Sequence, residues 1–321
     1  MNKKVVVFSQ IDSEVQAKLA EKYQLVVLNP KQGDINAQIR QAVVDADAMI
    51  GAGRLLNESN IATAEKLKII SSVSVGYDNY DVDYLNQKKI WLSNTPHVLT
   101  ETTADLAFTL LMSAARKVPS LDHWTKQGEW QRTVNATQFG QEIFGKTLGI
   151  IGLGHIGAAI ARRGFYGFNM NIVYHNRREK IEVAQQFNAQ YKSLEALLKQ
   201  ADFVVVAVDL NSQSKALIGA QEFALMQKHA VFVNIARGSV VDEQALTEAL
   251  QNRQIFAAGL DVYQKEPLQQ SPLFELDNVV TLPHIGSATA ETRKKMAELA
   301  LQNLVDALEQ RTPRYLVNEN F

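Results

Sequence analysis

The sequence contains no cysteine in its 321 residues. Disulfides, thiolate metal sites and cysteine nucleophiles all need this side chain, so the chain can use none of them. The same absence agrees with a reducing compartment. The six histidines are scattered and include no HExxH pair, so we expect no metal site.

Long apolar runs and long runs of one charge are also missing. No apolar stretch approaches the roughly 20 residues that a membrane helix needs, and the start of the chain, MNKKVVVF, lacks the features of a secretory signal. The 33 basic and 34 acidic side chains nearly balance, so no global field favours nucleic acid or an anionic membrane. We therefore expect a soluble cytoplasmic protein that binds neither nucleic acid nor membrane.

Short β-branched segments alternate with helical patterns in two series. Continuous apolar strands separated by amphipathic helices favour parallel sheets covered on both faces, so we predict an α/β fold with two doubly wound parallel-sheet domains. The predicted strands are 5–8, 25–28, 48–52, 69–73 and 90–93 in the first series, and 147–152, 171–175, 203–208, 230–236, 257–262 and 279–284 in the second.

Two long helices set the predicted domain boundaries. One begins with Thr100 as its N-cap and continues through Val118, and the other spans 289–309 with no strand after it. A final helix without a following strand is expected to pack back on the first domain. The predicted domains are therefore 1–99 plus 289–321, and 100–288.

A glycine-rich turn follows the first strand of the second series. Gly152, Gly154 and Gly157 form the GxGxxG of GLGHIG, between an apolar strand and a helical segment. In this context the glycines allow a tight turn, close approach of a pyrophosphate and close helix packing, with the phosphates at the helix N-terminus. We predict dinucleotide binding, although such turns also serve packing alone.

The next strand ends in positive charge. A carboxylate at this point would bind the ribose 2′-hydroxyl of NAD, but the chain has His175, Asn176, Arg177 and Arg178 instead. Guanidinium groups bind a 2′-phosphate that a carboxylate would repel, so NADP(H) is the preferred cofactor and NAD(H) remains possible. The alternative is that both arginines belong to a solvated loop.

Six motifs in order make the chain resemble the D-isomer-specific 2-hydroxyacid dehydrogenase family, closest to its glyoxylate and hydroxypyruvate reductases, which also take 2-ketogluconate. The motifs are SVGYDNYDVD (74–83), TPHVLTETTADLAF (95–108), GLGHIG (152–157), NIARGSVVDEQAL (234–246), GLDVYQKEP (259–267) and PHIGSAT (283–289). The resemblance covers essentially the whole chain. It implies a flavodoxin-like substrate domain and a Rossmann NAD(P)-binding domain.

The resemblance also implies a catalytic group of Arg237, Glu266 and His284, each at or just past the end of a predicted strand. A planar guanidinium can hold the carboxylate and carbonyl of a 2-keto acid together. The imidazole can protonate the alkoxide formed at C2, and the glutamate can fix the ring's tautomer. Taken singly, each residue type is ordinary on a surface.

Further roles are carried over from the resemblance. Backbone N–H groups at Val75 and Gly76 would bind the substrate carboxylate together with Arg237, unless that segment is only a turn. Trp130 would reach a neighbouring subunit of a homodimer, unless it packs in the core. Asp261 would contact the carboxamide, unless it only caps a turn. The expected cofactor contacts are Thr103, Gly152, Gly154, His155, Ile156, Gly157, Asn176, Arg177, Arg178, Val208, Ala236, Asp261, His284 and Gly286.

Two positions depart from the family pattern. The chain has VDLN at 208–211 where a proline-containing turn is usual, so Asp209 would weaken phosphate or adenine binding if it pointed inward. His155 stands where many relatives have arginine, which predicts weaker or pH-dependent neutralisation of the pyrophosphate.

The sequence thus predicts NADPH-dependent reduction of small 2-keto acids such as glyoxylate, hydroxypyruvate and 2-ketogluconate. Two alternatives stay open. One is an NAD-linked, phosphoglycerate-like dehydrogenase, which Arg177 and Arg178 disfavour. The other is a non-catalytic dinucleotide-sensing regulator on the same fold, against which the lack of extended disordered tails counts.

Overall fold

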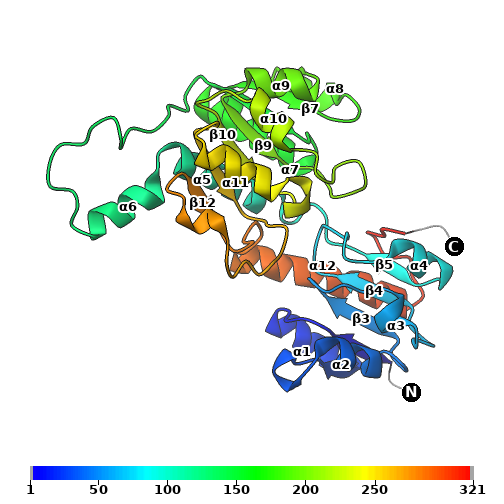
Figure 1. Cartoon of the computed structure of the whole chain (residues 1–321). Helices are drawn as coiled ribbons and strands as arrows, with labels where there is room; N and C mark the ends of the chain where they lie inside the picture. Colours follow the sequence, from blue (N-terminus) through cyan, green and yellow to red (C-terminus); the bar gives the residue numbers. More distant parts are fainter. Residues whose placement is uncertain (1–2, 319–321) are drawn as a thin grey trace. The chain divides into compact units, whose positions relative to one another are not determined.

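The computed structural model describes residues 3–318, which form two compact units. The first unit contains the chain up to Leu99 and from Ala288 onward, and the second is Thr100–Ser287. Each unit is a parallel sheet with helices packed against it (Figure 1). The predicted α/β class with two parallel sheets is confirmed. Within residues 3–318, no helix has the length and apolar character to cross a membrane.

The first unit has a five-stranded sheet of order β2-β1-β3-β4-β5. This is the doubly wound order of flavodoxin-like folds, with ligands expected beyond the carboxyl ends of the strands. Its strands are β1 (Lys4–Val7), β2 (Gln24–Val27), β3 (Ala48–Gly51), β4 (Ile69–Ser72) and β5 (Trp91–Ser93). Its helices are α1 (Ser13–Lys22), η1 (Pro30–Gln32), α2 (Ile35–Ala42), α3 (Glu58–Ile61), α4 (Val82–Gln87) and α12 (Ala290–Leu308).

The last helix, α12, belongs to this first unit. Thr289 caps its N-terminus, and the helix lies against β3 and β4. Leu304 is fully buried on its inner face, and the Ser71 hydroxyl of β4 donates to the Ala300 carbonyl over 2.8 Å. The helix α12 therefore completes the core of the first unit.

The second unit has a seven-stranded sheet of order β12-β11-β10-β9-β6-β7-β8, a Rossmann arrangement with an added edge strand. The strands are β6 (Thr147–Ile151), β7 (Asn171–His175), β8 (Gln190–Tyr191), β9 (Phe203–Val206), β10 (Val231–Asn234), β11 (Ala257–Leu260) and β12 (Val279–Thr281). The strand β8 is not among the predicted strands, because two exposed residues at a sheet edge give no apolar pattern.

Helices cover both faces of this sheet, and α5 packs on β10 and β11. The elements are α5 (Thr100–Ala115), α6 (Val118–Lys126), α7 (His155–Arg162), η2 (Arg163–Gly167), α8 (Ile181–Gln185), α9 (Leu194–Gln200), α10 (Ala220–Leu225), η3 (Gly238–Val240), α11 (Glu243–Gln251) and η4 (Pro272–Glu275).

The predicted single helix from Thr100 through Val118 is wrong at both ends. Thr100 is the first helical residue of α5, and α5 ends at Ala115. Lys117 adopts a left-handed backbone with φ 55°, which interrupts the helix before α6 begins. The segment after α6 projects from the second unit as a long, mostly exposed arm over 127–142 (Figure 1).

Candidate active site

The predicted catalytic residues follow three neighbouring strands of the second unit. Arg237 comes shortly after β10, Glu266 after β11 and His284 after β12, and these strands are adjacent and parallel. Because carboxyl ends of parallel strands share one edge of the sheet, the three side chains lie at the same edge.

Glu266 and His284 form a direct pair. The Glu266 Oε2 lies 2.6 Å from the His284 Nδ1, and its Oε1 accepts the Tyr263 N–H over 3.0 Å. Burial acts to raise the pKa of Glu266, but the His284 and Tyr263 hydrogen bonds and the charges of His284 and Arg237 outweigh it, so this pKa lies below its usual range. An ionised carboxylate can only accept, so Nδ1 of His284 carries a proton.

The backbone of His284 is held in an unusual conformation. It has φ 52°, in the left-handed region that non-glycine residues seldom adopt. The Asp261 carboxylate fixes the two residues that follow, accepting from the Ile285 N–H over 2.6 Å and the Gly286 N–H over 2.8 Å. Asp261 is only 1% exposed, and burial raises its pKa despite these hydrogen bonds. Both its oxygens therefore support the turn that carries the histidine.

Arg237 is placed by the turn after β10. Its Nη1 donates to the Ala236 carbonyl over 2.8 Å, and its charge contributes to lowering the pKa of Glu266. A Cβ on the next residue, Gly238, would lie 1.8 Å from the carbonyl carbon of Tyr263. Only glycine permits this approach, which brings the arginine turn against the loop that carries the glutamate.

A cavity of about 430 Å³ opens beside the Glu266–His284 pair. Apart from that pair it is lined mainly by apolar side chains, so the ionisable groups border a space from which part of the water is excluded. The lining residues are Tyr263, Glu266, Pro267, Leu268, Phe274, Thr281, Leu282, Pro283 and His284.

The glycine-rich turn has a different reason for each glycine. Gly152 has φ 104°, and a Cβ on Gly157 would lie 2.0 Å from the Gly152 carbonyl oxygen. A Cβ on Gly154 would meet nothing within 4 Å. The first and third glycines therefore close the turn, whereas the second leaves open space at the N-terminus of α7, which fits an approaching pyrophosphate. His155 and Ile156 begin that helix, and His155 is exposed.

The charged loop after β7 is tied to this turn. Asn176 Oδ1 accepts the Leu153 N–H over 2.7 Å, and Arg177 Nη1 donates to Gln213 Oε1 over 3.2 Å. Arg177 and Arg178 are both exposed. The asparagine thus shapes the glycine turn, and the guanidiniums lie at the surface beside it.

The loop after β9 also lies at this edge. Val208 is half-buried against the core, and its side chain is among the atoms nearest Gly152. Asp209 is exposed, and its carbonyl accepts the Ser214 hydroxyl over 2.6 Å. Asp209 therefore takes part in this turn through its backbone carbonyl, while its side chain is exposed.

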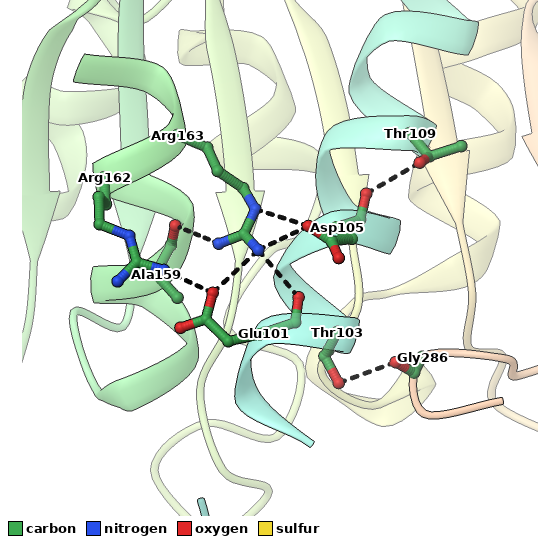
Figure 2. A network of polar contacts seen from close by, with 8 residues as sticks. All are labelled: Glu101, Thr103, Asp105, Thr109, Ala159, Arg162, Arg163 and Gly286. Carbon is green, nitrogen blue, oxygen red and sulfur yellow. Dashed lines mark hydrogen bonds and ion pairs between the residues drawn. The ribbon is translucent and has the colours of Figure 1, made fainter. Parts of the chain in front are cut away.

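Ion pairs join the start of α5 to Arg162 at the end of α7, the helix of the glycine turn, and to Arg163 at the start of η2 (Figure 2). Arg162 pairs with Glu101 at 2.5 Å, and Arg163 donates from Nε to Asp105 at 2.9 Å. The Thr103 hydroxyl donates to the Gly286 carbonyl over 2.9 Å. The first turns of α5 are thus joined to the end of α7 and to the loop that follows His284.

Residues 108–286 match the family described as "D-isomer specific 2-hydroxyacid dehydrogenase, NAD binding domain". The chain belongs to the D-isomer specific 2-hydroxyacid dehydrogenase family. It is therefore an NAD(P)-dependent oxidoreductase, which confirms the class predicted from its motifs.

Relatives within the 2-hydroxyacid dehydrogenase family match over nearly their full length. The chain is 43% identical to glyoxylate/hydroxypyruvate reductase B of Enterobacter sp. (strain 638) over 99% of this chain and 98% of the relative. It is 42% identical to that of Escherichia coli (strain K12 / DH10B), with the same two coverages. The NADPH-dependent glyoxylate/hydroxypyruvate reductase from Sinorhizobium meliloti, solved with NADP and malonate, is 31% identical with a TM-score of 0.88, covering 100% of this chain and 98% of that one.

Two further residues expected of a 2-hydroxyacid dehydrogenase, Val75 and Gly76, lie in the first unit. They follow β4 and are half-buried, and the Val75 carbonyl accepts from Asn94 Nδ2 over 2.9 Å. Tyr263 and Asn234 of the second unit are not among the residues predicted for the site. Tyr263 donates its hydroxyl to the Leu282 carbonyl over 3.0 Å and its N–H to Glu266. The only indication of Tyr263 in the sequence is its place in the GLDVYQKEP motif, three residues before Glu266.

Proposed function

We propose that this dehydrogenase uses NADPH to reduce small 2-keto acids to D-2-hydroxy acids, with glyoxylate, hydroxypyruvate and 2-ketogluconate as substrates. The observation that carries the proposal is the 2.6 Å Glu266–His284 pair beside Arg237, at the same sheet edge as the glycine turn. The names of the matching reductases support glyoxylate and hydroxypyruvate, and 2-ketogluconate is proposed from the family resemblance.

Arg237 is the proposed clamp for the keto acid. Its planar fork can bind one carboxylate oxygen and the carbonyl oxygen together, which orients C2 and polarises the carbonyl. Backbone N–H groups at Val75 and Gly76 are proposed to hold the carboxylate as well. The first unit then acts as the substrate domain, over 1–99 plus 289–321, and the second as the cofactor domain, over 100–288.

His284 is the proposed proton donor. Bound NADPH supplies a hydride to C2, so the carbonyl oxygen must gain a proton. With Nδ1 held by Glu266, the other ring nitrogen, Nε2, is the one that can deliver it. The carboxylate stabilises the charged ring before transfer and keeps the ring oriented.

The cofactor is proposed to lie along the carboxyl ends of β6, β7 and β9 to β12. Arg177 and Arg178 would bind the 2′-phosphate that distinguishes NADP from NAD. The remaining proposed contacts are Thr103, Gly152, Gly154, His155, Ile156, Gly157, Asn176, Val208, Ala236, Asp261, His284 and Gly286.

A homodimer that acts in the cytoplasm is proposed as the working form. The arm carries exposed apolar side chains, with Trp130 61% and Phe139 59% exposed, which a monomer would leave in water. A second copy of the chain is the proposed cover, with Trp130 reaching the partner's substrate site.

The test is steady-state turnover of NADPH and NADH with each of the three keto acids. We expect turnover with NADPH to exceed that with NADH. The variant H284N should lose roughly 10²- to 10⁴-fold in kcat. His229 offers a matched control, because its Nε2 lies 2.6 Å from Asp202 Oδ1. The two residues precede β10 and β9, so they lie at the amino ends of these strands, away from the candidate site.

The variant H229N should therefore retain activity. Absence of NADPH oxidation with all three keto acids would refute the proposed function. Equal losses of kcat in H284N and H229N would refute the proposed role of His284 but not the proposed function.

A further inference from the structure

We propose that Asn234 is a positioning residue that fixes the turn carrying Arg237, and through it the substrate clamp. This inference rests on the proposed function. Asn234 is the last residue of β10 and is 1% exposed. A side chain this deeply buried cannot bind substrate from solvent, so its effect has to pass through the residues it holds.

Both polar atoms of the Asn234 side chain bind the backbone of the arginine turn. Its Oδ1 accepts the Ala236 N–H over 3.0 Å, and its Nδ2 donates to the Arg237 carbonyl over 3.1 Å. The side chain therefore spans the turn with one acceptor and one donor. Among side chains of this size only an amide supplies both groups at this spacing, because a carboxylate cannot donate and an aliphatic chain can do neither.

The position of this turn also determines where the Arg237 guanidinium lies. Arg237 Nη1 donates to the Ala236 carbonyl over 2.8 Å, so the residue whose N–H Asn234 holds also anchors the charged group. A shift of Ala236 would therefore move the guanidinium. In well-aligned active sites a misplacement of about 1 Å can cost on the order of 100-fold in rate.

The backbone of Asn234 connects this turn to the histidine side of the site. Its carbonyl accepts the Asp261 N–H over 3.1 Å. The Asp261 carboxylate holds the Ile285 and Gly286 N–H groups, next to His284. Asn234 and Asp261 thus do the same work at the ends of adjacent strands, one for the arginine and one for the histidine.

Asn278 supplies a matched control. It is also buried in the second unit, at 4% exposure, and its Nδ2 donates to the Leu250 and Phe256 carbonyls over 3.2 Å each. It stands just before β12, away from the carboxyl ends of the strands. Its replacement removes a buried amide of equal size without touching the arginine turn.

The experiment compares N234A and N234D with N278A in the full chain. We expect N234A to raise the KM for glyoxylate and to lower kcat/KM roughly 10- to 100-fold, with the KM for NADPH unchanged. N234D keeps the acceptor and loses the donor, so its kcat/KM should also fall, and it serves as the second variant if N234A does not fold. N278A should keep the wild-type kcat/KM for glyoxylate.

Hydrogen–deuterium exchange provides a readout that needs no turnover. Exchange in a peptide covering 235–240 should rise in N234A and stay at the wild-type rate in N278A. The positioning role would be overturned if the peptide exchanged in N234A at the same rate as in the wild type, or if N234A and N278A lost kcat/KM equally. If the wild type itself reduces no keto acid, the proposed function fails and the exchange result alone decides the role of Asn234.

Discussion

Glu266 and His284 are 18 residues apart in the sequence and 2.6 Å apart in the structure. Asp202 and His229 make a pair of the same length in the same unit. The two pairs differ in their surroundings, because the first lies beside Arg237 and a largely apolar cavity. The second lies at the amino ends of strands, so position at the sheet edge separates a candidate catalytic pair from a surface ion pair.

Removing the carboxylate of Glu266 should change the pH dependence of catalysis. Glu266 stays ionised despite its burial because its hydrogen bonds to His284 and Tyr263 lower its pKa, and its charge favours a proton on the neighbouring ring, a contribution that glutamine lacks. We expect kcat/KM of E266Q to fall at lower pH than in the wild type. Measurement across the pH range gives the profile, and D202N is the control. A profile identical to the wild type would contradict this role of Glu266.

The paired arginines should set cofactor choice. Hydrogen bonds to charged groups contribute about 1.5–3 kcal/mol, so R177Q/R178Q should raise the KM for NADPH roughly 10-fold or more. The KM for NADH should stay the same. R253Q is the control, since Arg253 is exposed and pairs with Asp277 elsewhere in the unit. Equal changes in KM for both cofactors would count against a 2′-phosphate site.

Candidate site residues can be named from the sequence where a motif contains them. Arg237, Glu266 and His284 came from the family resemblance, and the structure brings them to one sheet edge. Asn234 lies within one of the same motifs, yet its residue type carries no chemical signal. Its proposed positioning role depends on which backbone groups lie within reach of its side chain, and no sequence pattern shows that.

At the scale of elements, the glycine turn contains one glycine that the fold requires and another that we expect to matter only for cofactor binding. Gly157 cannot accept a Cβ, whereas Gly154 has space for one. We expect G157A to lose several kcal/mol of stability, or to fail to fold, because the methyl group would overlap the Gly152 carbonyl. G154A should keep its stability and bind NADPH more weakly. Thermal unfolding and cofactor titration of both variants test this, and a stable G157A or a destabilised G154A would contradict it.

Element prediction succeeded for buried strands and failed where local geometry decided. The apolar runs that form β1 and β9 are fully or nearly fully buried, so their pattern was unambiguous. The end of α5 depends on one left-handed residue, Lys117, whose type gives no warning. The strand β8 is set by its pairing with β7 and not by its own composition.

For the whole molecule, the first unit depends on the C-terminal helix. Leu304 of α12 is fully buried, so L304A should reduce the free energy of unfolding of the first unit by about 2–5 kcal/mol. Urea unfolding followed by Trp91 fluorescence in a W124F/W130F background reports on that unit. Q302A, at an exposed position of the same helix, is the control. Equal midpoints for L304A and Q302A would show that α12 adds little to this core.

The second unit interrupts the first in the sequence, and its two ends lie side by side. The Thr103 hydroxyl, near the entry, bonds to the Gly286 carbonyl, near the exit. Residues 100–287 form one compact unit whose first and last residues lie close together, and such a segment can be exchanged as one piece of sequence. We expect exchange of this segment between relatives to transfer the proposed cofactor preference, since the glycine turn and the charged loop travel together.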